Sequence, residues 1–86
     1  MSDGDRTAID PAAVWPDDAD DVAEGVVANW FVREGGRVEA GATVCEIQVE
    51  KVSVDVPAPA TGTVEVLVGE NETFARGDPL GYVAPE

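Results

Sequence analysis

Few side chains in this sequence could carry covalent chemistry, and one primary amine stands apart. Lys51 is the sole lysine among 86 residues, Cys45 is the sole cysteine, and there is no histidine. A serine–histidine or cysteine–histidine nucleophile therefore cannot be assembled from this chain. Lys51 is either a solvated surface lysine or an amine held out for chemistry.

The other candidate groups point away from catalysis. We expect Cys45 to be a small core residue, because it falls on the apolar face of an alternating run. Paired acids occur in the segment 17–21, but a domain this small offers little interior to separate their pKa values. With one cysteine and no histidine, a metal site would rest on carboxylates alone. We predict neither a catalytic nor a metal-binding residue.

The residues around Lys51 predict a β-hairpin. Residues 43–49 and 52–56 both alternate apolar and polar side chains. A two-residue Glu50–Lys51 loop puts every apolar side chain on one face, and a one-residue slip would destroy that arrangement. Neither loop residue is Gly or Asn, which such loops prefer, so residue choice at the tip answers to something besides turn propensity. The predicted pairs are Val49 with Val52, Ile47 with Val54, and Cys45 with Val56.

An internal repeat with an offset of 36 residues organises the chain around this hairpin. Each half reads as a long strand, a turn, a short strand, a Gly turn and a further strand. We therefore predict an all-β sandwich or barrel, most simply closed by two four-stranded antiparallel sheets related by a pseudo-twofold axis. The matched residues of the first half are Ala28, Trp30, Phe31, Val32, Val38, Gly41, Val44 and Ile47; those of the second are Val64, Val66, Leu67, Val68, Phe74, Gly77, Leu80 and Val83.

The segments before the repeat are less regular. Residues 1–11 predict a flexible acidic tail, residues 12–15 a first strand, and residues 17–21 either a solvated acidic loop or a surface read by a partner. Residues 12–86 form the predicted domain. In the first half, Val26, Ala28, Trp30 and Val32 are expected to face inward. Phe31 and Leu67 break the inside–outside rule, and we expect them to be packed under the tail or at sheet edges.

Charge limits the choice of partners and compartment. The net charge of −13 disfavours nucleic acid, whose binding depends on basic side chains. The acidity fits either steering of a basic partner or adaptation to a saline cytoplasm, where charges are screened. The N-terminus lacks a signal-peptide core, and no apolar run approaches the ~20 residues that span a bilayer. We expect a soluble cytoplasmic protein.

The chain resembles the lipoyl domains of 2-oxo acid dehydrogenase complexes, from about Ala12 to Val83. The match includes the Glu50-Lys51-Val52 tip and the glycines of the repeat. The resemblance implies a flattened barrel-sandwich of two four-stranded sheets. It also implies lipoate in amide linkage to Lys51, with Glu50 and Val52 read as flanks by the lipoylating enzyme. The other matching residues are Pro16, Glu24, Gly25, Trp30, Glu34, Gly35, Val38, Gly41, Val44, Val56, Ala58, Pro59, Gly62, Val68, Gly77 and Leu80.

The resemblance also implies a function and partners. Such a domain is a swinging-arm carrier and not an enzyme, although it can be part of an acyltransferase component. It carries acyl groups and reducing equivalents among a thiamine-dependent 2-oxo acid decarboxylase, an acyltransferase core and a flavin dihydrolipoyl dehydrogenase. A lipoate-protein ligase or lipoyl transferase would attach the cofactor.

The sequence departs from the family pattern at a few positions. Asp-Lys-Ala is the commonest tip, where this chain has Glu50, Lys51 and Val52; Gly36, Asp18 and Ala19 also differ from the common residues. The acidic first loop leaves the cognate dehydrogenase open. Two alternatives stay open as well: a biotin carrier domain, although that branch typically has Met on both sides of the lysine, and an unmodified interaction module.

Overall fold

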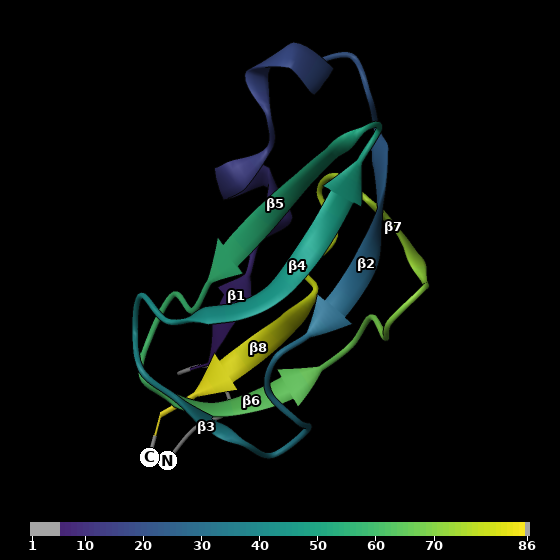
Figure 1. The fold of residues 1–86 in the computed structure, drawn as a ribbon. Helices are drawn as coiled ribbons and strands as arrows, with labels where there is room; N and C mark the ends of the chain where they lie inside the picture. Colours follow the sequence, from purple (N-terminus) through teal and green to yellow (C-terminus); the bar gives the residue numbers. More distant parts are fainter. Residues whose placement is uncertain (1–5, 86) are drawn as a thin grey trace.

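The structure, a computed structural model, describes residues 6–85, and these form two four-stranded antiparallel sheets packed face to face (Figure 1). This confirms the predicted fold class. No helix within the described residues has the length and apolar character to span a membrane. The strands are β1 (Thr7–Ile9), β2 (Glu24–Trp30), β3 (Arg37–Val38), β4 (Thr43–Val49), β5 (Val52–Pro57), β6 (Gly62–Val66), β7 (Thr73–Ala75) and β8 (Gly81–Ala84), and the short 3-10 helices are η2 (Pro11–Val14) and η3 (Asp17–Ala19).

The strand orders of the two sheets show the repeat directly. One sheet has the order β5-β4-β2-β7, and the other has β1-β8-β6-β3. The 36-residue offset maps β2, β3 and β4 onto β6, β7 and β8, and it places β1 where β5 stands in the other sheet. The short strand of each half lies in the sheet formed by the long strands of the other half: β3 lies beside β6, and β7 lies beside β2. The two halves therefore cannot separate without opening both sheets.

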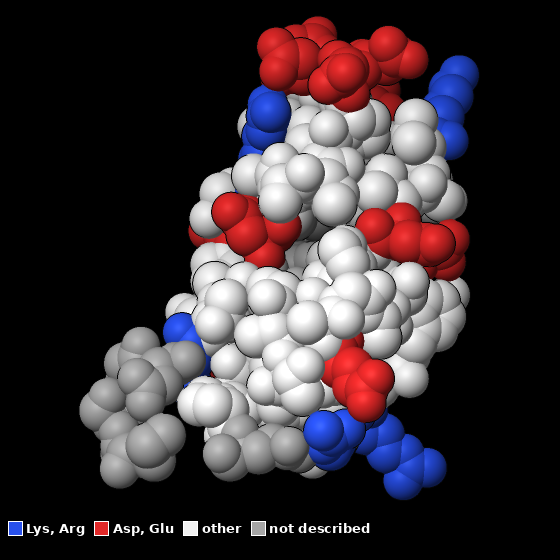
Figure 2. Space-filling view, turned by 90° about the vertical axis from the view of Figure 1, so that its left-hand side faces the viewer, with Lys and Arg blue, Asp and Glu red and all other residues white. Residues whose placement is uncertain are grey.

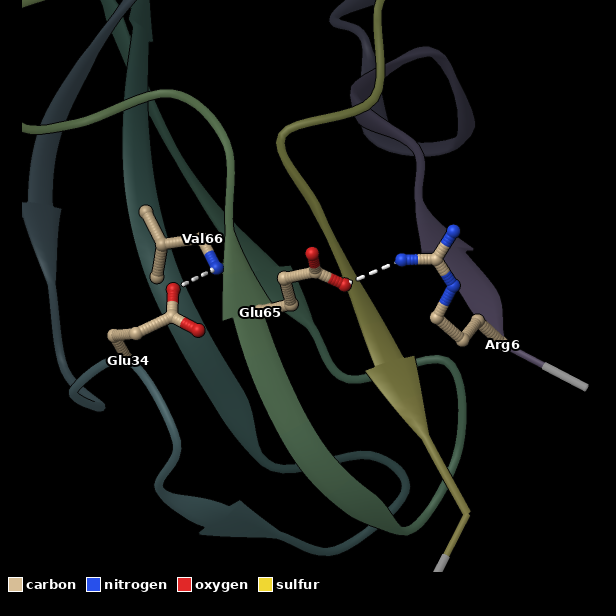
Figure 3. Close-up of polar contacts among 4 residues, drawn as sticks. All are labelled: Arg6, Glu34, Glu65 and Val66. Atoms are coloured by element: carbon tan, nitrogen blue, oxygen red, sulfur yellow. Dashed lines mark hydrogen bonds and ion pairs between the residues drawn. The ribbon is translucent and has the colours of Figure 1, made fainter. Parts of the chain in front are cut away.

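Reciprocal hydrogen bonds mark the pseudo-twofold axis at the waist of the molecule. The Val66 N–H donates to Glu34 Oε1 at 2.7 Å (Figure 3). The Trp30 N–H donates to Glu70 Oε2 at 2.9 Å, which is the same contact moved by 36 residues. Each carboxylate thus satisfies the backbone donor at the end of the long strand in the other half.

The inward face of β2 differs from its prediction because a β-bulge interrupts the strand. The β2–β4 register shifts between Val27 and Asn29, leaving Ala28 as the extra residue. Val27 is fully buried, whereas Val26 is 38% exposed. Val27 pairs with Ile47 as Val64 pairs with Val83, so the repeat offset before the bulge is 37. The alternation prediction was wrong at Val26 because an inserted residue exchanges the faces of a strand.

The N-terminal region also differs from its prediction. Residues 1–5 lie outside the described residues, but β1 pairs with β8 from Thr7 to Ile9, and Ile9 is buried. The predicted strand at 12–15 is wrong: this segment forms η2, which begins at Pro11 with Asp10 as its N-cap. An Asp before a Pro at the first helical position is a helix start, and three residues are enough for an edge strand when one of them fills the core.

The core lies between the sheets and takes at least one buried apolar residue from each of the eight strands. The expectation for Phe31 and Leu67 was wrong, because both side chains are exposed, at 58% and 50%. Each lies one residue beyond the end of a long strand, where its N–H still donates to the neighbouring segment, to Val44 O in β4 and to Leu80 O just before β8 respectively. The buried apolar residues are Ile9, Trp15, Ala19, Val27, Val38, Val44, Cys45, Ile47, Val49, Val56, Ala58, Val64, Phe74, Leu80 and Val83.

Candidate functional site

The β4–β5 hairpin has the register that the sequence predicts. Val49 pairs with Val52 across the Glu50–Lys51 turn, and the next inward pairs are Ile47 with Val54 and Cys45 with Val56. Lys51 therefore lies at the turn, and its side chain is exposed. It makes no hydrogen bond or ion pair with any residue within the described range. The amine is free to be acylated.

The turn holds one residue in a left-handed conformation. Glu50 has φ of 56°, which is uncommon for a residue other than Gly, Asn or Asp. The Gln48 side chain supports it, with Nε2 donating to the Glu50 carbonyl at 3.3 Å. A non-Gly residue at positive φ adds a cost that Asn or Gly would largely avoid, so the acid at this position has a role other than forming the turn.

The base of the hairpin is fixed by the core. β4 lies between β5 and β2 in its sheet, and Cys45, Ile47 and Val49 are fully buried. β5 is the edge strand, so Val52 remains 39% exposed although it points to the same face. The sheet thus supplies a rigid mount up to Val49, and only the tip projects from it.

The acidic segment 17–21 lies at the same end of the molecule and is held in place. Figure 2 shows acidic side chains gathered over the end that carries η3 and the hairpin turn in Figure 1. The Trp15 indole donates to the Ala19 carbonyl at 3.0 Å. Arg76 donates to the Asp20 carbonyl at 2.9 Å and lies over the Trp15 ring at 5.5 Å. Side-chain anchors therefore give this loop a defined shape.

A groove of about 360 Å³ lies beside the hairpin on the outer face of β4, β2 and β7. Its central row is Gln48, Val26 and Thr73, which the register places side by side. Gly25 also lines the groove, and a Cβ there would point away from it, toward the core, at 2.8 Å from the ring of the buried Phe74. Glu24 and Glu50 complete the lining.

Cys45 is placed as a core residue. It is fully buried, and desolvation raises the pKa of its thiol to about 12, so the thiolate needed for nucleophilic chemistry does not form at neutral pH. Among the described residues, no group of three or more His, Cys, Asp or Glu side chains could hold a metal ion.

The hairpin was predictable from the sequence, but the groove was not. Lys51, Glu50 and Val52 lie together at the tip as expected, while the contribution of Val26 was missed because strict alternation put it in the core. A bulge leaves no local sequence signal; the one available clue was that offsets of 36 and 37 each align part of the repeat.

Comparison with known proteins gives a family. The profile of the biotin/lipoyl family, described as "Biotin-requiring enzyme", matches residues 14–83. The dihydrolipoyllysine-residue acetyltransferase component of the pyruvate dehydrogenase complex of Staphylococcus epidermidis is 38% identical over 64 residues, 73% of this chain and 15% of the relative. Its counterpart in Staphylococcus aureus is 37% identical over 60 residues, 70% of this chain and 14% of the relative. The chain thus spans about a seventh of these curated relatives.

Two solved structures share the fold. The solution structure of the lipoyl domain of the 2-oxoglutarate dehydrogenase complex from Azotobacter vinelandii is 30% identical, with a TM-score of 0.65, covering 76% of this chain and 84% of that one. A single-chain, multi-domain long-chain acyl-CoA carboxylase has a TM-score of 0.75 at 21% identity, over 100% of this chain and 8% of that one; this second likeness shows the fold alone. The chain belongs to the biotinyl/lipoyl family and is a carrier domain of the lipoyl type.

Proposed function

We propose that Lys51 carries lipoate in amide linkage and that the domain serves a 2-oxo acid dehydrogenase complex. The observation that carries the proposal is the free, exposed amine of Lys51 at the tip of a hairpin whose base is buried in the core. Glu50 and Val52 flank it and are exposed, so an attaching enzyme can read both. The site fits the cofactor because neither an ion pair nor burial opposes acylation of the amine.

Lipoate is favoured over biotin by the relatives. Two of them are acetyltransferase components of pyruvate dehydrogenase complexes, and the lipoyl domain structure is 30% identical, compared with 21% for the carboxylase. The residues beside Lys51 are Glu50 and Val52, not the Met residues typical of biotin carriers. By the same reasoning the partners are the thiamine-dependent decarboxylase, the acyltransferase core and the flavin dehydrogenase.

The chain contributes position, not catalysis. The lipoyl group, when attached, supplies a dithiolane that exchanges acyl groups and electrons. The hairpin keeps the base of the arm fixed while Lys51 projects into solvent. Tethering raises the effective concentration of the carried group at each partner's active site, so a rigid mount and a mobile arm are both needed.

Intact mass tests the proposal. The chain is co-expressed with a lipoylating enzyme or with a biotinylating enzyme, and the Lys51→Ala variant is the control. A mass gain of one lipoyl amide that is absent from Lys51→Ala supports the proposal. A biotin-sized gain would assign the domain to the other branch, and no gain under either condition would make it an unmodified interaction module.

A further inference from the structure

The groove beside the hairpin combines one exposed apolar side chain, that of Val26, with two carboxylates, those of Glu24 and Glu50. Val26 lies at its centre and is 38% exposed, because the bulge at Ala28 turns it outward. Glu24 begins β2, and Glu50 lies in the turn that follows β4. Both acids line the groove, and both are exposed.

This arrangement has an unfavourable energy in the isolated chain. Like charges that line one groove repel each other, and an exposed valine loses the gain from burial. No residue within the described range forms an ion pair with Glu24 or Glu50. A basic side chain from outside would relieve both costs, because its methylene stem can cover Val26 while its charged head reaches the carboxylates.

The pseudo-twofold axis provides an internal comparison. The row Gln48, Val26 and Thr73 corresponds to Ala84, Thr63 and Arg37 in the other sheet, and Glu24 corresponds to Thr61. That equivalent row has neither the exposed valine nor the acid: the Thr61 hydroxyl accepts a hydrogen bond from the Ala40 N–H. The groove is therefore specific to the end that carries Lys51 and is not a by-product of the fold.

We propose that this groove receives a lysine or arginine side chain of the enzyme that attaches lipoate to Lys51. The inference rests on the proposed function and names a contact for it. It extends the recognition surface from the hairpin flanks to Glu24 and Val26 on the neighbouring strand.

The groove lies beside the base of the lysine arm, and this position favours the attaching enzyme over the other partners as the protein that contacts it. That enzyme acts on Nζ, which stays within a four-carbon stem of the hairpin, so its surface must contact the strands beside the turn. Enzymes that act on the far end of the loaded arm have no such requirement. The net charge of −13 favours a basic surface on the partner and rapid association at low salt.

Lipoylation kinetics with a lipoate-protein ligase test the groove. Glu24→Gln removes one rim charge and leaves the hairpin untouched, and the matched control, Asp55→Asn, removes one charge from the opposed pair Glu46–Asp55 in the same sheet. We expect Glu24→Gln to lower kcat/KM by about tenfold through KM and to flatten its salt dependence. Asp55→Asn should change kcat/KM by less than about twofold.

A second variant fills the groove from within. Val26→Lys places a basic side chain of the chain's own on the floor between Glu24 and Glu50. We expect Val26→Lys to raise the urea midpoint at low salt, because the new charge offsets the two carboxylates. We expect it also to lower kcat/KM for lipoylation, because the new side chain occupies the groove. A gain in stability together with a loss of modification would not arise from simple misfolding.

The outcomes separate this inference from the function on which it rests. If the unaltered chain is not lipoylated, the proposed function fails. If it is lipoylated and Glu24→Gln behaves like Asp55→Asn, or if Val26→Lys is modified at the unaltered rate, the groove is not the contact and the inference is overturned.

Discussion

The two ends of this molecule have equivalent strand pairs, but only one of these pairs is joined by a turn. At one end, β4 and β5 pair and are joined by the Glu50–Lys51 turn. At the other, the equivalent pair is β8 and β1, which come from opposite ends of the chain, so that Thr7 pairs with Val83 without any turn. Since the second pair forms without a tip, the tip residues are not what the fold requires. Their identities can be assigned to function.

Arg6 and Lys51, basic side chains at the two ends, also differ in whether they have a partner within the chain. At the β1–β8 end, Arg6 pairs with Glu65 at 2.5 Å (Figure 3) and lies over the Tyr82 ring at 4.6 Å. At the hairpin end, where acidic side chains gather (Figure 2), Lys51 has no partner among the described residues. Arg6 therefore has partners within the chain, whereas the Lys51 amine stays available for contacts with other molecules.

The largest expected effect comes from moving the amine along the tip. Exchanging Glu50 with Lys51, or Lys51 with Val52, keeps composition and net charge but shifts the lysine by one residue. We expect lipoylation to fall by about a hundredfold or more, since small misplacements cost that much at an active site. A time course of intact mass measures it, and an unchanged urea midpoint shows that the fold survives. Efficient modification of either exchanged variant would show that the ligase does not read the geometry of the tip.

The same contrast explains what sequence could predict. The hairpin was predictable because a period of two fixes both faces at once, and Cys45, Ile47 and Val49 leave only one register. The groove was not, because the bulge at Ala28 exchanges faces without a local signal. β1 was hidden among polar and acidic residues, where only the buried Ile9 distinguishes a strand from a tail.

Two equivalent glycines should differ in how much they tolerate. Gly25 and Gly62 occupy matching positions opposite Phe74 and Val38. A Cβ on Gly62 would lie 1.9 Å from the Ala84 carbonyl oxygen, a backbone atom, whereas at Gly25 the nearest atom, at 2.8 Å, belongs to the Phe74 ring. We expect Gly62→Ala to lower the free energy of unfolding by about 3 kcal/mol and Gly25→Ala by about 1 kcal/mol.

Urea unfolding at fixed salt compares these variants. Gly77→Ala is the control, since nothing lies within 4 Å of its added Cβ, and it should be close to neutral. Equal losses at Gly25 and Gly62 would mean that the close approach of β6 and β8 relaxes as readily as the contact at the hairpin end.

Salt should stabilise the molecule mainly through the sheet that carries the hairpin. That sheet has opposed acids at Glu46–Asp55, and Glu24 and Glu50 line the same groove, whereas Glu65 in the other sheet is paired with Arg6. We expect the free energy of unfolding to rise by about 1 to 2 kcal/mol between dilute buffer and molar KCl. Asp55→Asn should remove part of that rise by stabilising the chain in dilute buffer. An unfolding midpoint that does not move with KCl would rule out screening of these pairs and the saline-cytoplasm interpretation with it.

The smallest expected effects on unfolding come from the two reciprocal carboxylates, Glu34 and Glu70, where the halves are most alike. Glu34→Ala and Glu70→Ala each remove a carboxylate from a strand-end N–H, of Val66 and Trp30 respectively. A charge-assisted bond is worth about 2 kcal/mol when shielded, and these exposed ones should be worth about 1 kcal/mol.

A residual asymmetry should appear in this pair of variants. The Trp30 indole also donates to the Val68 carbonyl at 2.7 Å, and this bond still joins β2 to the segment after β6 when Glu70 is removed. Within residues 6–85, Val66 has no second bond of this kind to the segment after β2. Glu70→Ala should therefore cost less than Glu34→Ala in urea unfolding. The reverse order would mean that the bulged half depends more on its carboxylate and that the indole bond does not brace it.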